Sequence, residues 1–322
     1  MRIGRYLHQG TVQIGVVHHD RVHKVDTRLD VLEILNLPQE EQDALSASAG
    51  RRHRFPIEEA HWLPPVEPRA MRDFLGFEAH IAGMKKSFDG DGTVPEAWYE
   101  APGFLFMNPW SLFGATDEIP MPPLTQRLDF ELEACVIVKK MARNVTAEQA
   151  SDYIAGYAVF NDWSARDIQG REMQVGLGPN KGKDFANTMG PYITTPDELE
   201  QYREGDRLDL EMVVKVNGVE YGRDSLKNLS WSFEEMLSHA SRGANVGPGD
   251  VLATGTASMG AMSEHWSRSK QYETPKPLQV GDVVEMTIEG LGTIRNTVGP
   301  CDSPTPEYRV PRARRTYSED RL

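Results

Sequence analysis

Cysteine is scarce in this chain, and long apolar runs are missing. Its 322 residues include two cysteines, Cys135 in an apolar strand pattern and Cys301 in a proline-rich tail, and such isolated thiols exclude a disulfide framework. No stretch approaches the roughly 20 apolar residues that span a bilayer. The first ten residues, MRIGRYLHQG, lack the apolar segment of a signal peptide. The sequence therefore predicts a cytoplasmic protein.

Positive charge is also in short supply. The 35 Lys and Arg residues are outnumbered by 48 Asp and Glu residues, which gives a formal net charge of −13. A nucleic-acid-binding protein needs clustered basic residues to displace counterions, and an anionic membrane surface repels a chain of this sign. The charge balance therefore excludes both nucleic acid and membrane as expected partners.

The apolar spacing divides the chain into two units and a tail. Strand patterns at 10–17 and 21–27, with a helical turn at 31–37, predict a small N-terminal α/β domain over residues 1–65. The segment HWLPPVEP at 61–68 is predicted to be its exit linker. Residues 66–300 carry mainly β signals with a few helices, which predicts a larger, mostly β (α+β) domain. Residues 301–322 are polar and interrupted by proline, which is typical of a surface arm.

Local signals place several elements within the larger domain. Capping-box patterns predict two helix starts, one at Thr146 with Gln149 and one at Ser232 with Glu235. Within 207–224 the pair Asn217-Gly218 predicts a type I′ turn between two strands. A second strand, glycine turn and strand pattern covers 281–298.

Three carboxylates alternate with apolar residues in QRLDFELEACVIVKK, residues 126–140. The strand period of two places Asp129, Glu131 and Glu133 on one face, which continues as Cys135. Neighbouring buried carboxylates repel one another unless a cation or protons intervene. Hard oxygen ligands favour Mg²⁺, Ca²⁺ or Mn²⁺ over Zn²⁺. An edge strand with a solvated acidic face is the alternative.

A further acidic residue follows another strand pattern. The apolar run YIAGYAVF leads directly into NDWSARDIQ, residues 161–169, so that Asp162 is expected at the end of a strand, where side chains can point into a cleft. The same segment carries Arg166 and Gln169 at the spacing of one helical turn. By itself this segment is equally typical of a capped turn.

Together these motifs resemble a known family. The string ELE at 131–133, NDWSARDIQ at 161–169 and GPNKGKDF at 178–185 are similar to motifs of the fumarylacetoacetate hydrolase family, and the resemblance covers about residues 71–300. It implies a mixed β-roll or β-sandwich catalytic domain behind a smaller N-terminal domain, usually as a homodimer. It also implies a divalent metal held by Glu131, Glu133 and Asp162, with Mg²⁺ as the first choice and Ca²⁺ or Mn²⁺ as alternatives.

The resemblance also implies a catalytic pair. RDFLGFEAH at 72–80 is similar to the family segment that supplies a further metal carboxylate, here Asp73, and the catalytic base, here His80. VLATGTASMGAMSEHW at 251–266 supplies Glu264, which matches the glutamate that orients the base. An imidazole with an ordinary pKa near 6.5 can take a proton from water at neutral pH. Without the resemblance, His80 would be interpreted as a packed or surface histidine.

The remaining site residues are implied by the same motifs. Lys183, Arg166 and Gln169 match positions near the reacting oxygen or the metal, and Gly255-Thr256 resembles the loop that contacts the substrate. For Arg166, a salt bridge to Asp167 or Glu172 is the alternative.

Two departures bear on the substrate. Leu75 and Met173 stand where fumarylacetoacetase has tyrosines that hold the substrate's carboxylate. They favour an acylpyruvate or another diketo acid over fumarylacetoacetate itself.

The predicted activity is hydrolysis of a carbon–carbon bond in a 1,3-diketo acid by water that His80 activates. The family also contains decarboxylases and isomerases, so that fold membership does not decide the chemistry. An oxaloacetate decarboxylase-type lyase and a diketo-acid isomerase or tautomerase are therefore the alternatives.

Overall fold

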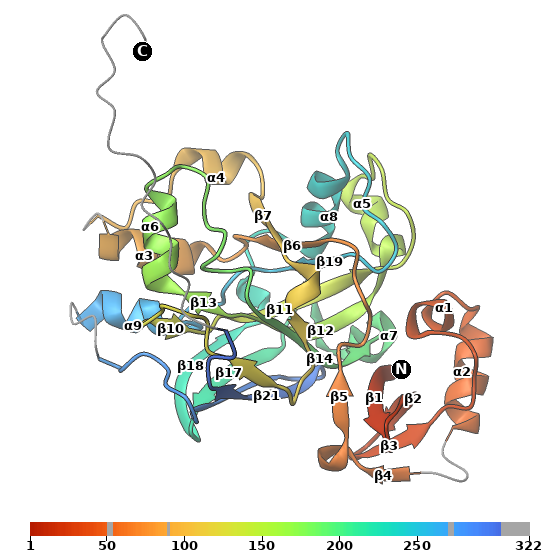
Figure 1. The fold of residues 1–322 in the computed structure, drawn as a ribbon. Helices are drawn as coiled ribbons and strands as arrows, with labels where there is room; N and C mark the ends of the chain where they lie inside the picture. The colour runs from red at the N-terminus through yellow and green to blue at the C-terminus, as the bar shows by residue number, and fades with distance from the viewer. Residues whose placement is uncertain (50–53, 89–90, 270–273, 304–322) are drawn as a thin grey trace, which may run out of the picture.

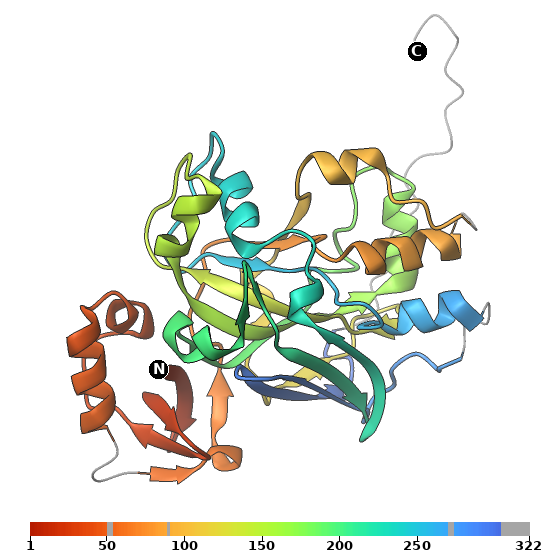
Figure 2. The ribbon, with the colours of Figure 1, turned by 180° about the vertical axis from the view of Figure 1, so that it is seen from behind.

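The computed structural model describes residues 1–49, 54–88, 91–269 and 274–303. Most of the predicted surface arm, residues 304–322, lies outside the described residues. Two β-sheets pack face to face at the centre, helices gather at either end of them, and the N-terminal strands and helices lie to one side (Figure 1; Figure 2). Within the described parts of the chain, no helix is long and apolar enough to cross a membrane.

The large sheet runs through both predicted domains. Its ten main strands are, in spatial order, β4 (Arg54–Pro56), β3 (Arg21–Lys24), β2 (Thr11–His18), β1 (Arg2–His8), β14 (Asn187–Thr194), β12 (Ile154–Asp162), β11 (Leu132–Val138), β19 (Val251–Ala253), β6 (Met71–Phe74) and β7 (Phe104–Met107). Two shorter strands join it, β5 (His61–Leu63) beside β1 and β8 (Leu112–Phe113) beside β14. The antiparallel pairing of β1 with β14 connects the N-terminal strands to the rest of the sheet.

A second sheet covers one face of the first. Its strands are β18 (Val219–Ser225), β17 (Glu211–Val216), β20 (Val283–Ile288), β21 (Gly292–Gly299) and β9 (Glu118–Pro120). Two short ribbons complete the β structure, β10 (Leu128–Asp129) with β13 (Ser164–Ala165), and β15 (Arg203–Glu204) with β16 (Arg207–Leu208). The predicted mostly β sandwich is confirmed.

Helices close the ends of the sandwich. They are α1 (Val31–Leu35), α2 (Gln39–Ser48), α3 (Glu78–Phe88), α4 (Glu96–Glu100), α5 (Ala147–Ala150), α6 (Arg166–Met173), α7 (Pro196–Leu199), α8 (Phe233–Ser241) and α9 (Met262–Ser269). Both views place α3, α6 and α9 together at one end, with α5 and α8 at the other (Figure 1; Figure 2).

Alternating apolar residues build the core between the sheets. One face of β11 carries Leu132, Ala134 and Val136, which belong to the same buried cluster as Met212 and Val214 of β17. The opposite face carries Cys135 and Ile137, which belong to a second cluster with residues of α1. Because β11 is apolar on both faces and lies between β12 and β19, it is an interior strand. The alternative of a solvated edge strand is wrong.

The predicted helix starts and the predicted turn are present in the structure, whereas the predicted linker is not fully so. Thr146 and Ser232 are the N-caps of α5 and α8, each in a capping box, as predicted. Asn217 and Gly218 have φ values of 51° and 78°, which the predicted type I′ turn requires. The linker prediction for 61–68 is wrong at its start, because β5 pairs with β1 and buries Trp62.

Candidate metal and catalytic site

The order of the large sheet brings five strand ends to one edge. Strand β11 is antiparallel to both β12 and β19, so that its N-terminal end meets the C-terminal ends of those strands. Strand β6 runs parallel to β19 and places Asp73 beside Ala253. Strand β14 begins opposite Asp162. Segments 73, 131–133, 162, 183–187 and 254–256, distant in sequence, therefore converge at this edge.

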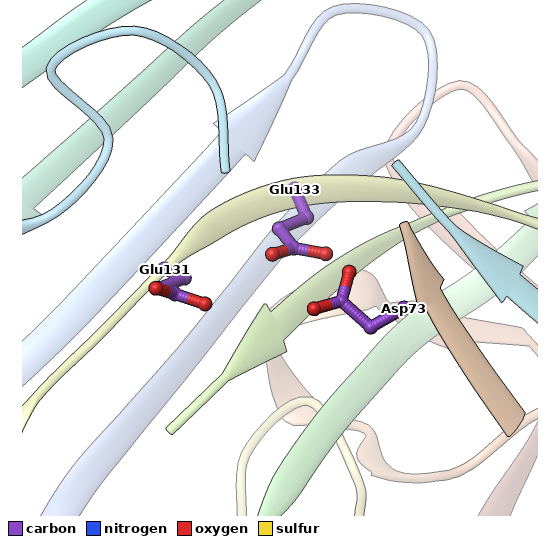
Figure 3. A group of neighbouring side chains, drawn as sticks. All are labelled: Asp73, Glu131 and Glu133. Atoms are coloured by element: carbon purple, nitrogen blue, oxygen red, sulfur yellow. The ribbon is translucent and has the colours of Figure 1, made fainter. Parts of the chain in front are cut away.

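Three of the four predicted metal carboxylates form one group. Asp73, Glu131 and Glu133 each offer an oxygen atom within 4.8 Å of the others, and their exposed fractions are 4%, 4% and 0%. Figure 3 shows Asp73 from β6 facing the two glutamates at the start of β11. The Oδ1 atom of Asp73 and the Oε1 atom of Glu133 are buried without a hydrogen-bond partner. A bound divalent cation would satisfy such oxygens.

Asp162 lies next to this group but is held by a lysine. Its Oδ2 atom accepts a hydrogen bond from Nζ of Lys183, which also donates to Oε2 of Glu131 at 2.5 Å. The second oxygen of Asp162, Oδ1, is buried without a hydrogen-bond partner. Burial opposes ionisation of Glu131, but Lys183 and Arg166 outweigh it and hold the pKa of that carboxyl below its ordinary value. Lys183 therefore keeps one carboxylate charged within a crowded acidic cluster.

Ionisation is unfavourable at three neighbouring carboxyls, those of Asp73, Glu133 and Asp162. Burial is the main cause that raises the pKa of Asp73 to about 7, against the opposing charge of Lys183. Burial and then the charges of Asp73 and Glu131 raise the pKa of Glu133 well above its ordinary value. Burial likewise raises the pKa of Asp162. These carboxyls favour protons when no cation is bound.

This electrostatic conflict predicts a pH-dependent metal affinity. A carboxyl with a raised pKa must release its proton before it can bind a cation, and the pKa of Asp73 is about 7. Protonated Asp73 stabilises the metal-free protein, and this stability is lost as pH rises from about 4 through 7. Mg²⁺ affinity rises as the proton leaves Asp73. At a fixed Mg²⁺ concentration, the increase in Tm should therefore be larger at pH 8 than at pH 6. Equal increases at the two pH values would contradict this prediction.

The predicted catalytic pair is in contact. His80 near the start of α3 and Glu264 near the start of α9 lie 2.7 Å apart, between Nδ1 of the ring and Oε1 of the carboxylate. The other carboxylate oxygen, Oε2, accepts a hydrogen bond from the backbone N–H of Met259 at 3.0 Å. In the neutral ring, a proton on Nδ1 would donate to this carboxylate and leave Nε2 as the acceptor. The ring lies within electrostatic range of Glu131.

Arg166 opens α6 and faces the carboxylates. Its Nη2 atom donates to Oε1 of Glu131 at 2.7 Å, its Nε atom to Oδ2 of Asp129 at 2.8 Å, and its Nη1 atom to Oε1 of Gln169 at 3.1 Å. The alternative prediction, a salt bridge from Arg166 to Asp167 or Glu172, is wrong. Asp167 instead accepts hydrogen bonds from the Thr125 hydroxyl and from the backbone N–H of Gln126. Glu172 instead accepts from three backbone N–H groups, those of residues 180–182.

The glycine-rich segment approaches the metal group closely. Gly255 has a φ of 78°, and a Cβ atom there would lie 2.1 Å from the carbonyl oxygen of Phe74, so that only glycine fits. Its backbone N–H donates to Oε2 of Glu133 at 3.2 Å. Thr256 is buried next to it. The segment thus passes beside a carboxylate of the predicted metal site.

The remaining predicted residues lie farther out. Leu75 and Met173 are 46% and 56% exposed. Met173 lines a cavity of about 770 Å³ between α3, α6 and α9, whose wall also includes Arg166, Gln169 and Trp266. Lys183 borders a smaller cavity of about 230 Å³.

Two residues near the site carry roles that the sequence did not reveal. The predicted alternation holds here, because Phe130 joins Leu132 and Ala134 in one buried cluster. Asp129 nevertheless binds Arg166 and lies outside the metal group of Asp73, Glu131 and Glu133. Glu172 fixes the turn that precedes Lys183. In the sequence, Glu172 has no signal beyond its helical context, whereas Asp129 belongs to an evident acidic cluster.

Known proteins are similar to this chain in sequence. A family model described as fumarylacetoacetate (FAA) hydrolase C-terminal matches residues 69–299. Oxaloacetate tautomerase YisK of Bacillus subtilis is 32% identical over 176 residues, which cover 55% of this chain and 54% of the relative. The 2,4-didehydro-3-deoxy-L-rhamnonate hydrolase of a Sphingomonas species is 32% identical over 188 residues, which cover 58% and 61%. These matches span little more than half of each relative.

A solved structure shares the whole fold. Maleylpyruvate hydrolase from Sphingobium sp. SYK-6, determined in complex with a manganese(II) ion and pyruvate, superposes with a TM-score of 0.67 at 22% identity. The superposition covers 94% of this chain and 100% of that one.

Proposed function

The chain belongs to the fumarylacetoacetate hydrolase family, and on this premise we propose that it is a divalent-metal-dependent hydrolase that cleaves a carbon–carbon bond in a 1,3-diketo acid. The observation that carries the proposal is the contact of His80 with Glu264 at 2.7 Å, beside the group of buried carboxylates. An isolated metal site suits several reactions of the family, whereas an oriented base next to it suits the activation of water.

The carboxylate group fits a hard divalent cation. Its ligand atoms are all oxygens, and two of them are buried without a hydrogen-bond partner. We propose Mg²⁺ as the resident ion, with Mn²⁺ or Ca²⁺ as substitutes, and Asp73, Glu131, Glu133 and Asp162 as its ligands. The manganese in the structurally similar maleylpyruvate hydrolase supports this choice. When bound, the ion would polarise the oxygens of the substrate as a Lewis acid.

The chain's own residues account for the proton transfers. His80 accepts a proton from water on Nε2, and Glu264 stabilises the imidazolium through Nδ1. The resulting hydroxide adds to the carbonyl carbon farther from the substrate's carboxylate. The bond from that carbon to the central methylene then breaks, and its electron pair stays with the methylene carbon, which takes up a proton. For an acylpyruvate, one water is consumed and the products are a carboxylic acid and pyruvate.

Two cationic side chains, Lys183 and Arg166, contact the carboxylates of the site. The ammonium group of Lys183 lies between Glu131 and Asp162 and borders a cavity. We propose that it stabilises the oxyanion that forms when hydroxide adds to the carbonyl. Arg166 contacts three acceptors already, and its proposed role is to hold Glu131 and Gln169 in place.

The cavity between α3, α6 and α9 suits the acyl group of the substrate. Met84, Met173 and Trp266 contribute apolar surface to it, and an apolar wall favours an acyl chain over a second carboxylate. Leu75 offers no hydroxyl group to bind a carboxylate. We therefore propose an acylpyruvate-type substrate rather than fumarylacetoacetate.

A tautomerase is the second candidate function. It is favoured by the 32% identity to the oxaloacetate tautomerase of Bacillus subtilis. A tautomerase moves a proton between carbon and oxygen and consumes no water. The two functions therefore differ in their products as well as in their substrates.

A panel of acylpyruvates separates these functions. With Mg²⁺ or Mn²⁺ present, a hydrolase removes the enol absorbance of the diketone and forms one pyruvate for each acylpyruvate consumed. A tautomerase speeds the approach to keto–enol equilibrium and forms no pyruvate. Absence of pyruvate with every acylpyruvate tested would contradict the proposed hydrolase.

A further inference from the structure

Asp129 is a buried carboxylate that belongs neither to the metal group nor to the catalytic pair. It is 0% exposed, and its two oxygens accept four hydrogen bonds. Oδ1 accepts from the backbone N–H groups of Phe130 at 2.7 Å and Met262 at 2.8 Å. Oδ2 accepts from the backbone N–H of Ser263 at 3.0 Å and from Nε of Arg166 at 2.8 Å. A carboxylate with this many donors is held rigidly.

Two of these bonds fix the helix that carries Glu264. Met262 and Ser263 are the first residues of α9, and Glu264 follows them directly. The first backbone N–H groups of a helix have no partner within it, so that Asp129 satisfies two of them and anchors the start of α9. The helix cannot shift relative to β10 without breaking these bonds, and Glu264 is therefore held where His80 meets it.

The fourth bond connects the same carboxylate to the metal group. Arg166 donates to Asp129 through Nε and to Glu131 through Nη2 at 2.7 Å. The guanidinium group is planar and rigid. A single chain of contacts therefore runs from Glu131 through Arg166 and Asp129 to the start of α9.

We propose that Asp129 is a positioning residue that sets the catalytic pair, His80 and Glu264, relative to the metal carboxylates. Its effect on turnover rests on the proposed function, whereas its effect on the geometry of the pair does not. Removal of its charge leaves two of the four donors without an acceptor, because an amide has one oxygen. The start of α9 then shifts, and the contact between Glu264 and His80 lengthens.

The chain offers a matched control in Asp250. This aspartate is also buried, and it accepts hydrogen bonds from the backbone N–H groups of Ala70 and Gly247 and from Nη1 of Arg72. It holds no element that carries Glu264 or His80. Asp250→Asn therefore measures the general cost of removing a buried, paired aspartate.

The experiment compares Asp129→Asn with Asp250→Asn at saturating Mg²⁺. The Nδ1 proton of His80 in its contact with Glu264 should give a downfield proton resonance, identified by its loss in His80→Ala. We expect Asp129→Asn to shift or remove this resonance and Asp250→Asn to retain it. Turnover of an acylpyruvate should fall about 10- to 100-fold in kcat for Asp129→Asn with KM changed less than about threefold. Asp129→Glu, which keeps the charge but displaces the carboxylate, replaces Asp129→Asn if that variant does not fold.

The outcomes separate this proposal from the proposed function. If no diketo acid is cleaved even by the unaltered enzyme, the proposed function fails, and the resonance alone decides the role of Asp129. An unchanged resonance in Asp129→Asn overturns the proposal. So does a loss of kcat no greater than that of Asp250→Asn.

Discussion

Glu133→Gln is expected to abolish both metal binding and turnover. Glu133 is fully buried, and one of its oxygens has no hydrogen-bond partner, so that a bound cation would satisfy that oxygen. An amide retains the shape of the side chain but removes the charge. Mg²⁺ affinity should fall at least about 100-fold, since substitution of groups that merely support metal ligands already costs 10- to 100-fold. Loss of the Lewis acid should lower kcat by about 10³-fold or more.

The same substitution should not destabilise the metal-free protein. Burial and the neighbouring Asp73 and Glu131 charges raise the pKa of Glu133, which means that its ionised form is unfavourable there. Glu133→Gln should therefore have an equal or higher Tm without metal and should lose the increase in Tm on addition of Mg²⁺. Glu131→Gln combined with Glu133→Gln should give the same loss of the metal response. A retained Mg²⁺-dependent increase in Tm would remove these residues from the ligand set.

His80→Ala should be the second severe variant. Loss of a general base typically costs about 10²- to 10⁴-fold in rate, and His80, whose Nδ1 lies 2.7 Å from the Glu264 carboxylate, is the proposed base. The Mg²⁺-dependent increase in Tm should be unaffected, because the three grouped carboxylates remain in place. Stopped or continuous assays of acylpyruvate cleavage measure the effect.

The chain supplies a control histidine next to the pair. His265 follows Glu264 on α9 and packs edge-on against Tyr221, with ring centroids 5.8 Å apart. His265→Ala should keep nearly the full rate. Near-normal acylpyruvate cleavage by His80→Ala would show that His80 does not activate water. Retained decarboxylation of oxaloacetate in that variant, with loss of acylpyruvate cleavage, would assign the two reactions to different groups.

The local elements could be predicted because their causes are local. The capping boxes at Thr146 and Ser232 and the Asn217-Gly218 turn depend on residues three or fewer positions apart. The sequence contains no comparable signal for the pairing of strands that are distant along the chain. The contact of β1 with β14 joins residues almost 200 positions apart, and alternation within a strand does not identify its neighbour.

In the candidate site, too, sequence motifs identified residues, whereas contacts between distant segments could not be predicted. The strand period placed Glu131 with Glu133, and the family motifs added Asp73, His80 and Glu264, which the structure brings to one edge of the sheet. The period could not separate Asp129 from these glutamates, although Asp129 binds Arg166 and lies outside the metal group. Nor could spacing reveal that Arg166 spans Asp129 and Glu131, since its nearer acidic neighbours are Asp167 and Glu172. Tertiary contacts, rather than helical neighbours, decide the partners of Arg166.

The most direct test of the proposed hydrolysis follows the oxygen atom of water. An acylpyruvate is incubated with the enzyme and Mg²⁺ in water labelled with ¹⁸O, and the products are analysed by mass spectrometry. Hydrolysis predicts pyruvate and an equal amount of carboxylic acid that carries one ¹⁸O atom from the solvent in its new carboxylate. Recovery of the intact diketo acid without labelled carboxylic acid, under conditions where the enzyme binds Mg²⁺, would contradict the account.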